Sequence, residues 1–263
     1  MQAPRRGQVR VGSRHTAGKT TVDPKYPGFT NIVSLTKSTK YGMLGPYVLT
    51  VPIKIGGIKH EILFENLYQS SKIYAVVPGT KQVKSRFDRT LIWEWPEQEH
   101  YRQIKNPDGS VSDYYTPEYF HWRTSIMLAK EPVRYPVGIK YRGDCLFAIR
   151  CDENGILDPR KFNYVESRRE IYLRDYLPAL KAHPEFKKLK ARVDRGENLL
   201  IIEVDCCQEE SIDYYMQTYG VPRNFIEQGT MLATEENFNI LLNDTRHRWG
   251  HGFVIAGALA GFY

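Results

Sequence analysis

The stretch Glu65-Asn66-Leu67-Tyr68-Gln69-Ser70-Ser71-Lys72 carries the strongest structural signal in this chain. In a helix, Glu65, Gln69 and Lys72 stand at positions i, i+4 and i+7 and therefore share one face. Large apolar side chains lie on the other side. The spacing predicts a helix over residues 63–75 whose polar stripe faces an internal pocket. An ordinary solvated helix face stays open as the alternative, because such pairs are common on protein surfaces.

A short hairpin is predicted to lead into this helix. Residues 47–55 alternate enough for a strand, residues 58–62 return, and Gly56-Gly57 lies between them. Pro52 lacks the N–H that a central strand would need, which suggests an edge position. We therefore expect two paired strands, the second of which continues into the helix.

Helices and short strands follow without regular alternation. We expect helices over residues 117–130, 167–177, 184–195 and 234–242, and strands over residues 91–95, 145–150 and 199–204. Pro178 is expected to end the second helix and Thr234 to cap the last. The apolar residues 253–259 predict a terminal helix or strand. This irregular order predicts an α+β fold.

The composition indicates a folded chain with a packed core, because 41% of its 263 residues are hydrophobic and 25% are charged. The chain contains no apolar run of about 18 residues. No apolar segment follows the basic N-terminal residues. We therefore expect no membrane partner and a cytoplasmic location. The four cysteines fit no common zinc pattern, so we expect reduced thiols, no metal and no cofactor.

Part of the net charge of +7 is concentrated in residues 1–28, which are poor in apolar residues. The basic residues of this segment are Arg5, Arg6, Arg10, Arg14, Lys19 and Lys25, against Asp23. One-sided charge without apolar periodicity is typical of a flexible arm. We expect this arm to bind a polyanion such as nucleic acid and to add nothing to folding.

Residues 244–252, Asp-Thr-Arg-His-Arg-Trp-Gly-His-Gly, form a second signal between two apolar segments. A loop this rich in polar and aromatic groups is a candidate site, and its glycines allow a ligand to approach the backbone. Asp244, His247 and His251 could also bind a metal, although Gly250 argues against a helix that would align the two histidines. A loop that only caps neighbouring helices is the further alternative.

Residues 121–127, His-Trp-Arg-Thr-Ser-Ile-Met, form a third signal. Trp122 could stack on a base and Arg123 could pair with a phosphate. Core packing of Trp122 is the competing interpretation.

In their order along the chain these motifs resemble those of the NADAR superfamily. The resemblance rests on residues 41–47, on the Glu65 helix, on Trp122-Arg123 with Met127, on residues 198–203, and on Asp244 with Trp249-Gly250-His251-Gly252. It implies an α+β N-glycosidase that acts on a nucleotide, a ribosylated base or an ADP-ribosylated substrate. The chain departs from the pattern at Asn66, where the family has His, and in residues 131–180, which resemble an insertion.

The resemblance also implies site residues. Glu65 would stabilise positive charge on the sugar carbon, Lys72 would contact a phosphate or keep Glu65 ionised, and Asp244 would be the second acid. The substrate-binding candidates are Tyr47, Asn66, Gln69, Trp95, Trp122, Arg123, Arg246, Trp249, Gly250 and Gly252. Glu65, Lys72, Asp244 and Trp249 are expected to converge on one cleft.

We thus expect an arm at residues 1–28 and a single NADAR-like domain at 29–263, with an insertion at about 131–180. Two other functions stay open. One is a non-catalytic nucleic-acid-binding or assembly protein with a broad basic face. The other is a metal-dependent hydrolase that uses Asp244, His247 and His251.

Overall fold

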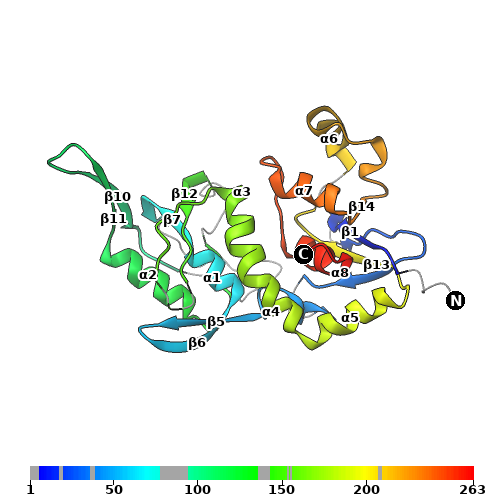
Figure 1. Ribbon diagram of the computed structural model, residues 1–263, viewed down its shortest axis with the longest axis horizontal. Helices are drawn as coiled ribbons and strands as arrows, with labels where there is room; N and C mark the ends of the chain where they lie inside the picture. The colour runs from blue at the N-terminus through cyan, green and yellow to red at the C-terminus, as the bar shows by residue number, and fades with distance from the viewer. Residues whose placement is uncertain are drawn as a thin grey trace. The chain divides into compact units, whose positions relative to one another are not determined.

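The fold is mixed α+β (Figure 1). The computed structural model describes residues 6–17, 20–35, 39–77, 94–135, 143–152, 154, 156–206 and 209–263. The chain forms two compact units. We call Met1–Gly45 together with Tyr172–Tyr263 the sheet unit, and Pro46–Ile171 the hairpin unit. This division differs from the predicted arm and insertion, because the chain leaves the sheet unit and returns to it.

The sheet unit is built on four strands in the order β14-β1-β13-β4. Their bounds are Thr230–Leu232, Val9–Ser13, Leu199–Glu203 and Thr30–Val33, respectively. β1 and β4 run parallel to β13 on either side of it, and β14 is antiparallel to β1. β13 is buried along its whole length, as its continuous apolar sequence predicts.

Helix α8, His251–Ala260, packs against β1 and β13 (Figure 1). All but the last of its residues are buried. Since a helix that is apolar all round belongs in a core, residues 253–259 are a core helix rather than a strand. Helices α4, α5 and α7 contact α8 and have the bounds Leu177–Ala182, Pro184–Asp194 and Glu235–Asn243. The Thr234 side chain caps α7 as predicted.

The segment around Pro178 differs from its prediction. α3, Tyr164–Ser167, continues through a π-helical segment, Arg168–Tyr176, into α4. Pro178 therefore does not end the helix. It lies at the start of α4, directly after the π-helical segment.

Shorter elements complete the sheet unit. They are β2 His15–Ala17, β3 Thr20–Val22, η1 Gly42–Leu44, η4 Glu209–Ser211, α6 Ile212–Tyr219 and η5 Arg223–Phe225. β2 and β3 pair as a small hairpin. α6 supplies side chains to the candidate site described below.

The prediction of a flexible arm is wrong for β1. Val9 and Val11 are buried, and the strand pairs with neighbours on both sides. Arg10 is buried as well, where its Nε donates to Thr230 Oγ1 at 2.8 Å and its guanidinium lies 3.7 Å from the centre of the Tyr26 ring. The five residues of β1 are therefore part of the core of the sheet unit, although they belong to the predicted arm.

The hairpin unit begins with the predicted pair of strands, β5 Thr50–Ile55 and β6 Ile58–Leu63. Both glycines of the turn have positive φ, 58° at Gly56 and 80° at Gly57, a conformation that favours glycine. β6 leads into α1, Phe64–Ser70. The helix is shorter than predicted, because Lys72–Tyr74 form strand β7, which pairs with β12, Cys145–Ala148.

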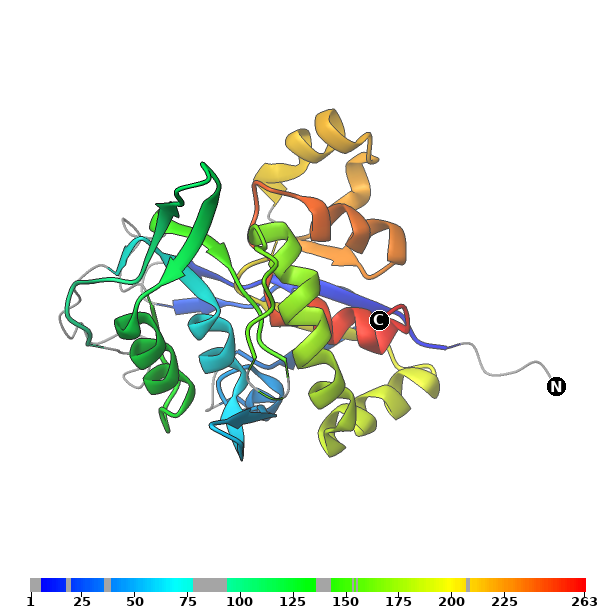
Figure 2. The same ribbon diagram turned by 60° about the vertical axis from the view of Figure 1, so that its left-hand side comes forward.

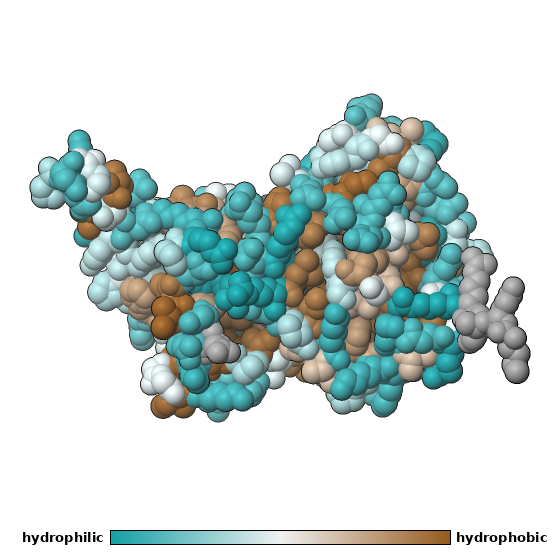
Figure 3. Space-filling model, viewed as in Figure 1, coloured by the Kyte–Doolittle hydropathy of each residue, from teal (hydrophilic) through white to brown (hydrophobic). Residues whose placement is uncertain are grey.

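A second hairpin follows the short pair β8 Val76–Val77 and β9 Gln98–Glu99. It consists of β10 Tyr101–Lys105 and β11 Val111–Tyr115, with a turn that contains Gly109, and precedes α2 Pro117–Met127 (Figure 2). Figure 3 shows hydrophilic residues over most of this hairpin, with some apolar ones among them. Ile104 and Val111 of the two strands are exposed. Of the strand predicted at 91–95, residues 91–93 lie outside the described residues.

The core of the hairpin unit is aromatic. Tyr74, Tyr119, Trp122 and Tyr135 are almost fully buried, and Trp122 meets the other three rings at centroid distances of 5.4–6.3 Å. β12 belongs to this unit through its pairing with β7. Residues 131–171 are therefore part of this compact unit, and the predicted insertion at about 131–180 stays a prediction.

Within the described ranges, no helix is both long enough and apolar enough to cross a membrane.

Candidate functional site

A row of three polar side chains runs along α1 to the start of β7. Gln69 Nε2 donates to Glu65 Oε1 at 2.7 Å, and Lys72 Nζ donates to Gln69 Oε1 at 2.7 Å. Glu65 and Lys72 are half-buried, whereas Gln69 is buried. The predicted association of a carboxylate, an amide and an ammonium group is therefore present, and the amide joins the two charged groups.

Lys72 reaches this row from a strand instead of a helix. Its ammonium group also donates to the Tyr135 carbonyl oxygen at 3.2 Å and lies 5.5 Å from the centre of the Tyr68 ring. Burial raises the pKa of Tyr68, so its hydroxyl stays neutral. The ammonium position is thus fixed by contacts with both α1 and the rest of the hairpin unit.

Asn66 holds the chain that follows α2. Its Nδ2 donates to the carbonyl oxygens of Ala129 and Glu131 at 2.9 and 3.1 Å, and its Oδ1 accepts from Val133 N at 2.7 Å. The side chain is fully buried. These contacts give Asn66 a structural role in place of the predicted substrate contact.

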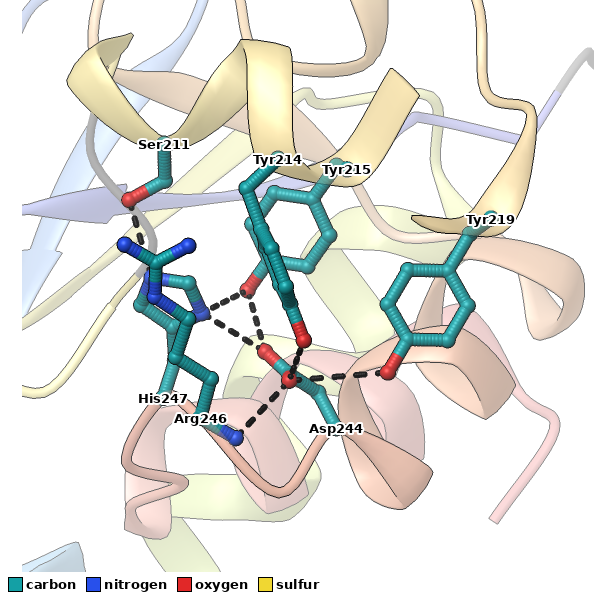
Figure 4. Close-up of polar contacts among 7 residues, drawn as sticks. All are labelled: Ser211, Tyr214, Tyr215, Tyr219, Asp244, Arg246 and His247. Carbon is teal, nitrogen blue, oxygen red and sulfur yellow. Dashed lines mark hydrogen bonds and ion pairs between the residues drawn. The ribbon is translucent and has the colours of Figure 1, made fainter. Parts of the chain in front are cut away.

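Asp244 directly follows α7 and is the centre of a dense hydrogen-bond network (Figure 4). Its Oδ1 accepts from the Tyr214 hydroxyl at 2.8 Å and from Arg246 N at 3.0 Å. Its Oδ2 accepts from the Tyr215 hydroxyl at 2.8 Å and lies 2.7 Å from His247 Nδ1. Both oxygens are thus held by groups of the protein.

The network keeps Asp244 ionised although it is only 1% exposed. Burial by itself would raise the pKa of this carboxyl, but the Arg246 amide, His247 and the two tyrosine hydroxyls outweigh it and lower the pKa. An enclosed carboxylate of this kind is suited to position its neighbours. This favours a positioning role for Asp244 over the predicted role of a second acid that acts on the substrate.

Gly250 and Gly252 lie against the Glu203 side chain at the end of β13. A Cβ at Gly250 would be 2.7 Å from Glu203 Oε2, and one at Gly252 would be 2.8 Å from the same atom. Gly252 N donates to this oxygen at 2.6 Å, and His251 Nδ1 lies 3.3 Å from it. The glycines therefore make room for a buried carboxylate, where an approaching ligand was predicted.

The predicted tryptophan platforms are largely internal. Trp249 is 5% exposed and packs between Tyr172 and Phe253, and Trp122 is fully buried. Trp95 is half-buried beside His121, with ring centres 5.6 Å apart. Core packing is thus the role that the contacts give Trp122 and Trp249.

The two predicted arginines differ. Arg123 is 5% exposed, inside the hairpin unit. Arg246 is exposed, with its guanidinium 4.5 Å from the centre of the Tyr214 ring. Tyr47 is half-buried before β5. Of these three residues, Arg246 therefore has the charged group that is most open to a ligand.

Within the hairpin unit the structure brings together Glu65, Gln69 and Lys72, and within the sheet unit Asp244 and His247. The expected cleft that combines Glu65 and Lys72 with Asp244 and Trp249 takes residues from both units and stays a prediction.

The metal interpretation gains no support. In the part of the chain that the structure describes, no three His, Cys, Asp or Glu residues are grouped to hold a metal ion. His247 faces Asp244, whereas His251 Nε2 lies 3.1 Å from the carbonyl oxygen of Ser34.

Four residues of these networks were not predicted as site residues: Glu203, Ser211, Tyr214 and Tyr215. Glu203 carried a signal, because it ends an apolar strand with a charge. Ser211 and the two tyrosines of α6 carried a weaker signal, since the three residues stand at i, i+3 and i+4, the spacing of one helix face.

Comparison of the chain with family models, with curated proteins and with solved structures gave no match.

Proposed function

We propose that this protein is a NADAR-like N-glycosyl hydrolase that cleaves a base–ribose or ADP-ribosyl N-glycosidic bond in a nucleotide or a modified nucleic acid. The observation that carries the proposal is the hydrogen-bonded row of Glu65, Gln69 and Lys72. The row contains the Glu, Gln and Lys of the Glu65 helix, which is one of the motifs on which the resemblance rests.

The chemistry needs a fixed negative charge near the sugar. Departure of the base leaves positive charge on the anomeric carbon, and a nearby carboxylate stabilises this charge and can orient the attacking water. Glu65 is half-buried, so it retains access to solvent while Gln69 holds one of its oxygens. These properties suit a carboxylate that acts on a substrate directly.

Gln69 and Lys72 support this role. The amide links the carboxylate to the ammonium group, which orients Glu65 and favours its charged form. The ammonium group would also attract the phosphate of a nucleotide or of ADP-ribose. The substrate class is therefore a phosphorylated riboside.

The test is the release of base from nucleotides and modified nucleosides, and of ADP-ribose from ADP-ribosylated DNA, by the wild type and by Glu65→Gln. Loss of a charge placed for the transition state should lower the rate on the order of a hundred- to a thousand-fold. Glu61→Gln is the matched control, because Glu61 is an exposed carboxylate on the adjacent strand β6. Full activity of Glu65→Gln would refute the proposal.

The alternative of a nucleic-acid-binding arm loses support from the fold. Arg14 pairs with Asp23, and Arg6 Nε lies 3.2 Å from Asp194 Oδ1. With Arg10 buried, these three arginines are engaged inside the sheet unit. They are less able to neutralise phosphates than the free arm that the sequence predicted.

A further inference from the structure

A serine hydroxyl lies at one end of the Asp244 network (Figure 4). Ser211 Oγ is 3.0 Å from His247 Nε2, and His247 Nδ1 is 2.7 Å from Asp244 Oδ2. Serine, histidine and aspartate joined in this order, through opposite nitrogens of the ring, are the arrangement that activates a hydroxyl nucleophile.

The position of Ser211 makes this contact informative. Ser211 ends η4 and precedes α6, a place where a serine side chain commonly accepts a hydrogen bond from the first turn of the helix. Ser211 makes no such capping bond. Its hydroxyl meets the imidazole instead.

Asp244 determines which nitrogen of His247 carries the proton. The Tyr215 hydroxyl lies 3.0 Å from His247 Nδ1 but donates to Asp244 Oδ2. An ionised carboxylate only accepts hydrogen bonds, so Nδ1 of the neutral ring donates to the same oxygen and Nε2 is left as an acceptor. The Tyr215 ring stacks on the imidazole at 5.1 Å with an interplanar angle of 27°, which fixes the ring plane. The lone pair of Nε2 is thus aimed at the Ser211 hydroxyl.

Solvent exposure is lowest at Asp244 and higher at His247 and Ser211, as a buried acid and an accessible nucleophile require. The Asp244 side chain is 1% exposed, the His247 side chain is 23% exposed, and Ser211 is half-buried. The acid is therefore shielded from water, while the hydroxyl end can meet a reagent. Tyr214 and Tyr215, one turn further along the same helix face, hold Asp244 from the other side.

We propose that Ser211 is the nucleophile of a second, acyl-transfer activity that acts on carboxylic esters and is independent of the glycosidase. Ser211 Oγ attacks the ester carbonyl and its proton moves to His247 Nε2. The new Oγ–C bond replaces the ester C–O bond, and His247 returns the proton to the departing alkoxide. Water then cleaves the acyl-serine by the same steps, with His247 as the base.

The test uses a fluorophosphonate probe, which forms an Oγ–P bond with an activated serine and releases fluoride. Wild-type protein should be labelled, with the label mapped by mass spectrometry to Ser211. Ser211→Ala should abolish this labelling, and His247→Gln should slow it by about a hundredfold or more because the base is lost. Ser110→Ala is the matched control, since Ser110 is exposed and bonds to Asp108 without a histidine.

Hydrolysis of p-nitrophenyl acetate should follow the same order among the four proteins. Thermal unfolding of each variant checks that it is folded. If His247→Gln does not fold, the site mapping in wild-type protein and the Ser211→Ala variant still decide the question. Wild-type labelling no faster than that of urea-unfolded protein, or labelling that persists in Ser211→Ala, would overturn the proposal.

Discussion

The two units place a carboxylate in opposite situations. In the sheet unit, Asp244 is almost fully buried, and tyrosine hydroxyls, a backbone amide and an imidazole surround it. In the hairpin unit, Glu65 is half-buried and lies in a row with Gln69 and Lys72. A carboxylate that acts on a substrate must be reachable, and one that orients other groups must be fixed. The comparison therefore assigns direct chemistry to Glu65 and positioning to Asp244.

The largest effect is expected from a charge placed in β1. Val11 is fully buried in the sheet unit, whereas Val111 on the β11 strand of the hairpin unit is 58% exposed. Val11→Asp should cost about 4 kcal/mol or more and abolish cooperative unfolding of the sheet unit, because an unpaired charge would enter the core. Val111→Asp should change stability by less than about 0.5 kcal/mol. Urea titrations of both variants measure the difference, and equal stability would show that β1 is not docked.

The next largest effect is expected from removing the buried carboxylate, which should cost more stability than removing the half-buried one. Asp244→Ala leaves several buried donors without an acceptor and should cost about 3 kcal/mol in the free energy of unfolding. Glu65→Ala removes a half-buried group and should cost about 1 kcal/mol. Chemical unfolding of the two variants compares them directly. A larger loss in Glu65→Ala would reverse the assignment of roles.

Acid should weaken the hairpin unit first. Burial of His100 lowers its pKa from 6.5 to about 4, so the unfolded chain takes up a proton before the folded chain does. Its neutral form thus adds stability that is complete above pH 6.5 and is lost as the pH falls towards 4. The loss should amount to about 3 kcal/mol.

Folding lowers the pKa of Asp244 below its usual value of 3.8. The stability that this carboxylate provides is therefore present above pH 3.8 and is lost only at lower pH. Hydrogen exchange at pH 7 and pH 4.5 should therefore show opening of the hairpin unit alone. His100→Phe should remove most of this response. An unchanged response in that variant would contradict the assignment to His100.

A smaller effect is expected at the glycines next to Glu203. Gly252→Ala would place a Cβ 2.8 Å from Glu203 Cβ and should cost about 2 kcal/mol. Gly143→Ala is the control in the hairpin unit, because a Cβ there meets nothing within 4 Å. Thermal unfolding separates the two. A neutral Gly252→Ala would mean that Glu203 can move aside.

Local sequence signals predicted local structure well. The β5–β6 hairpin, α2, the capped helix α7 and β13 lie close to their predicted positions because turn residues, caps and apolar runs act over a few residues. β1 was missed because it has only five residues and its partner β13 lies about 190 positions further along the chain. Such a pairing leaves little trace in the sequence around it.

The same limit applies to the sites. Glu65, Gln69 and Lys72 could be associated from their spacing, since they lie within eight residues. The Asp244 network draws on tyrosines about 30 residues away, and no periodicity joins the two segments. The loop was predicted to be important from its composition, but its partners required the fold.

The most direct test of the comparison is chemical rescue. Glycosidic-bond cleavage by Glu65→Ala and Asp244→Ala should be measured with and without formate, at a temperature where both variants are folded. A small carboxylate can replace a side chain that acts on the substrate, but it cannot rebuild a buried network. We expect formate to restore at least about tenfold in rate to Glu65→Ala and nothing to Asp244→Ala. Rescue of Asp244→Ala without rescue of Glu65→Ala would contradict the account.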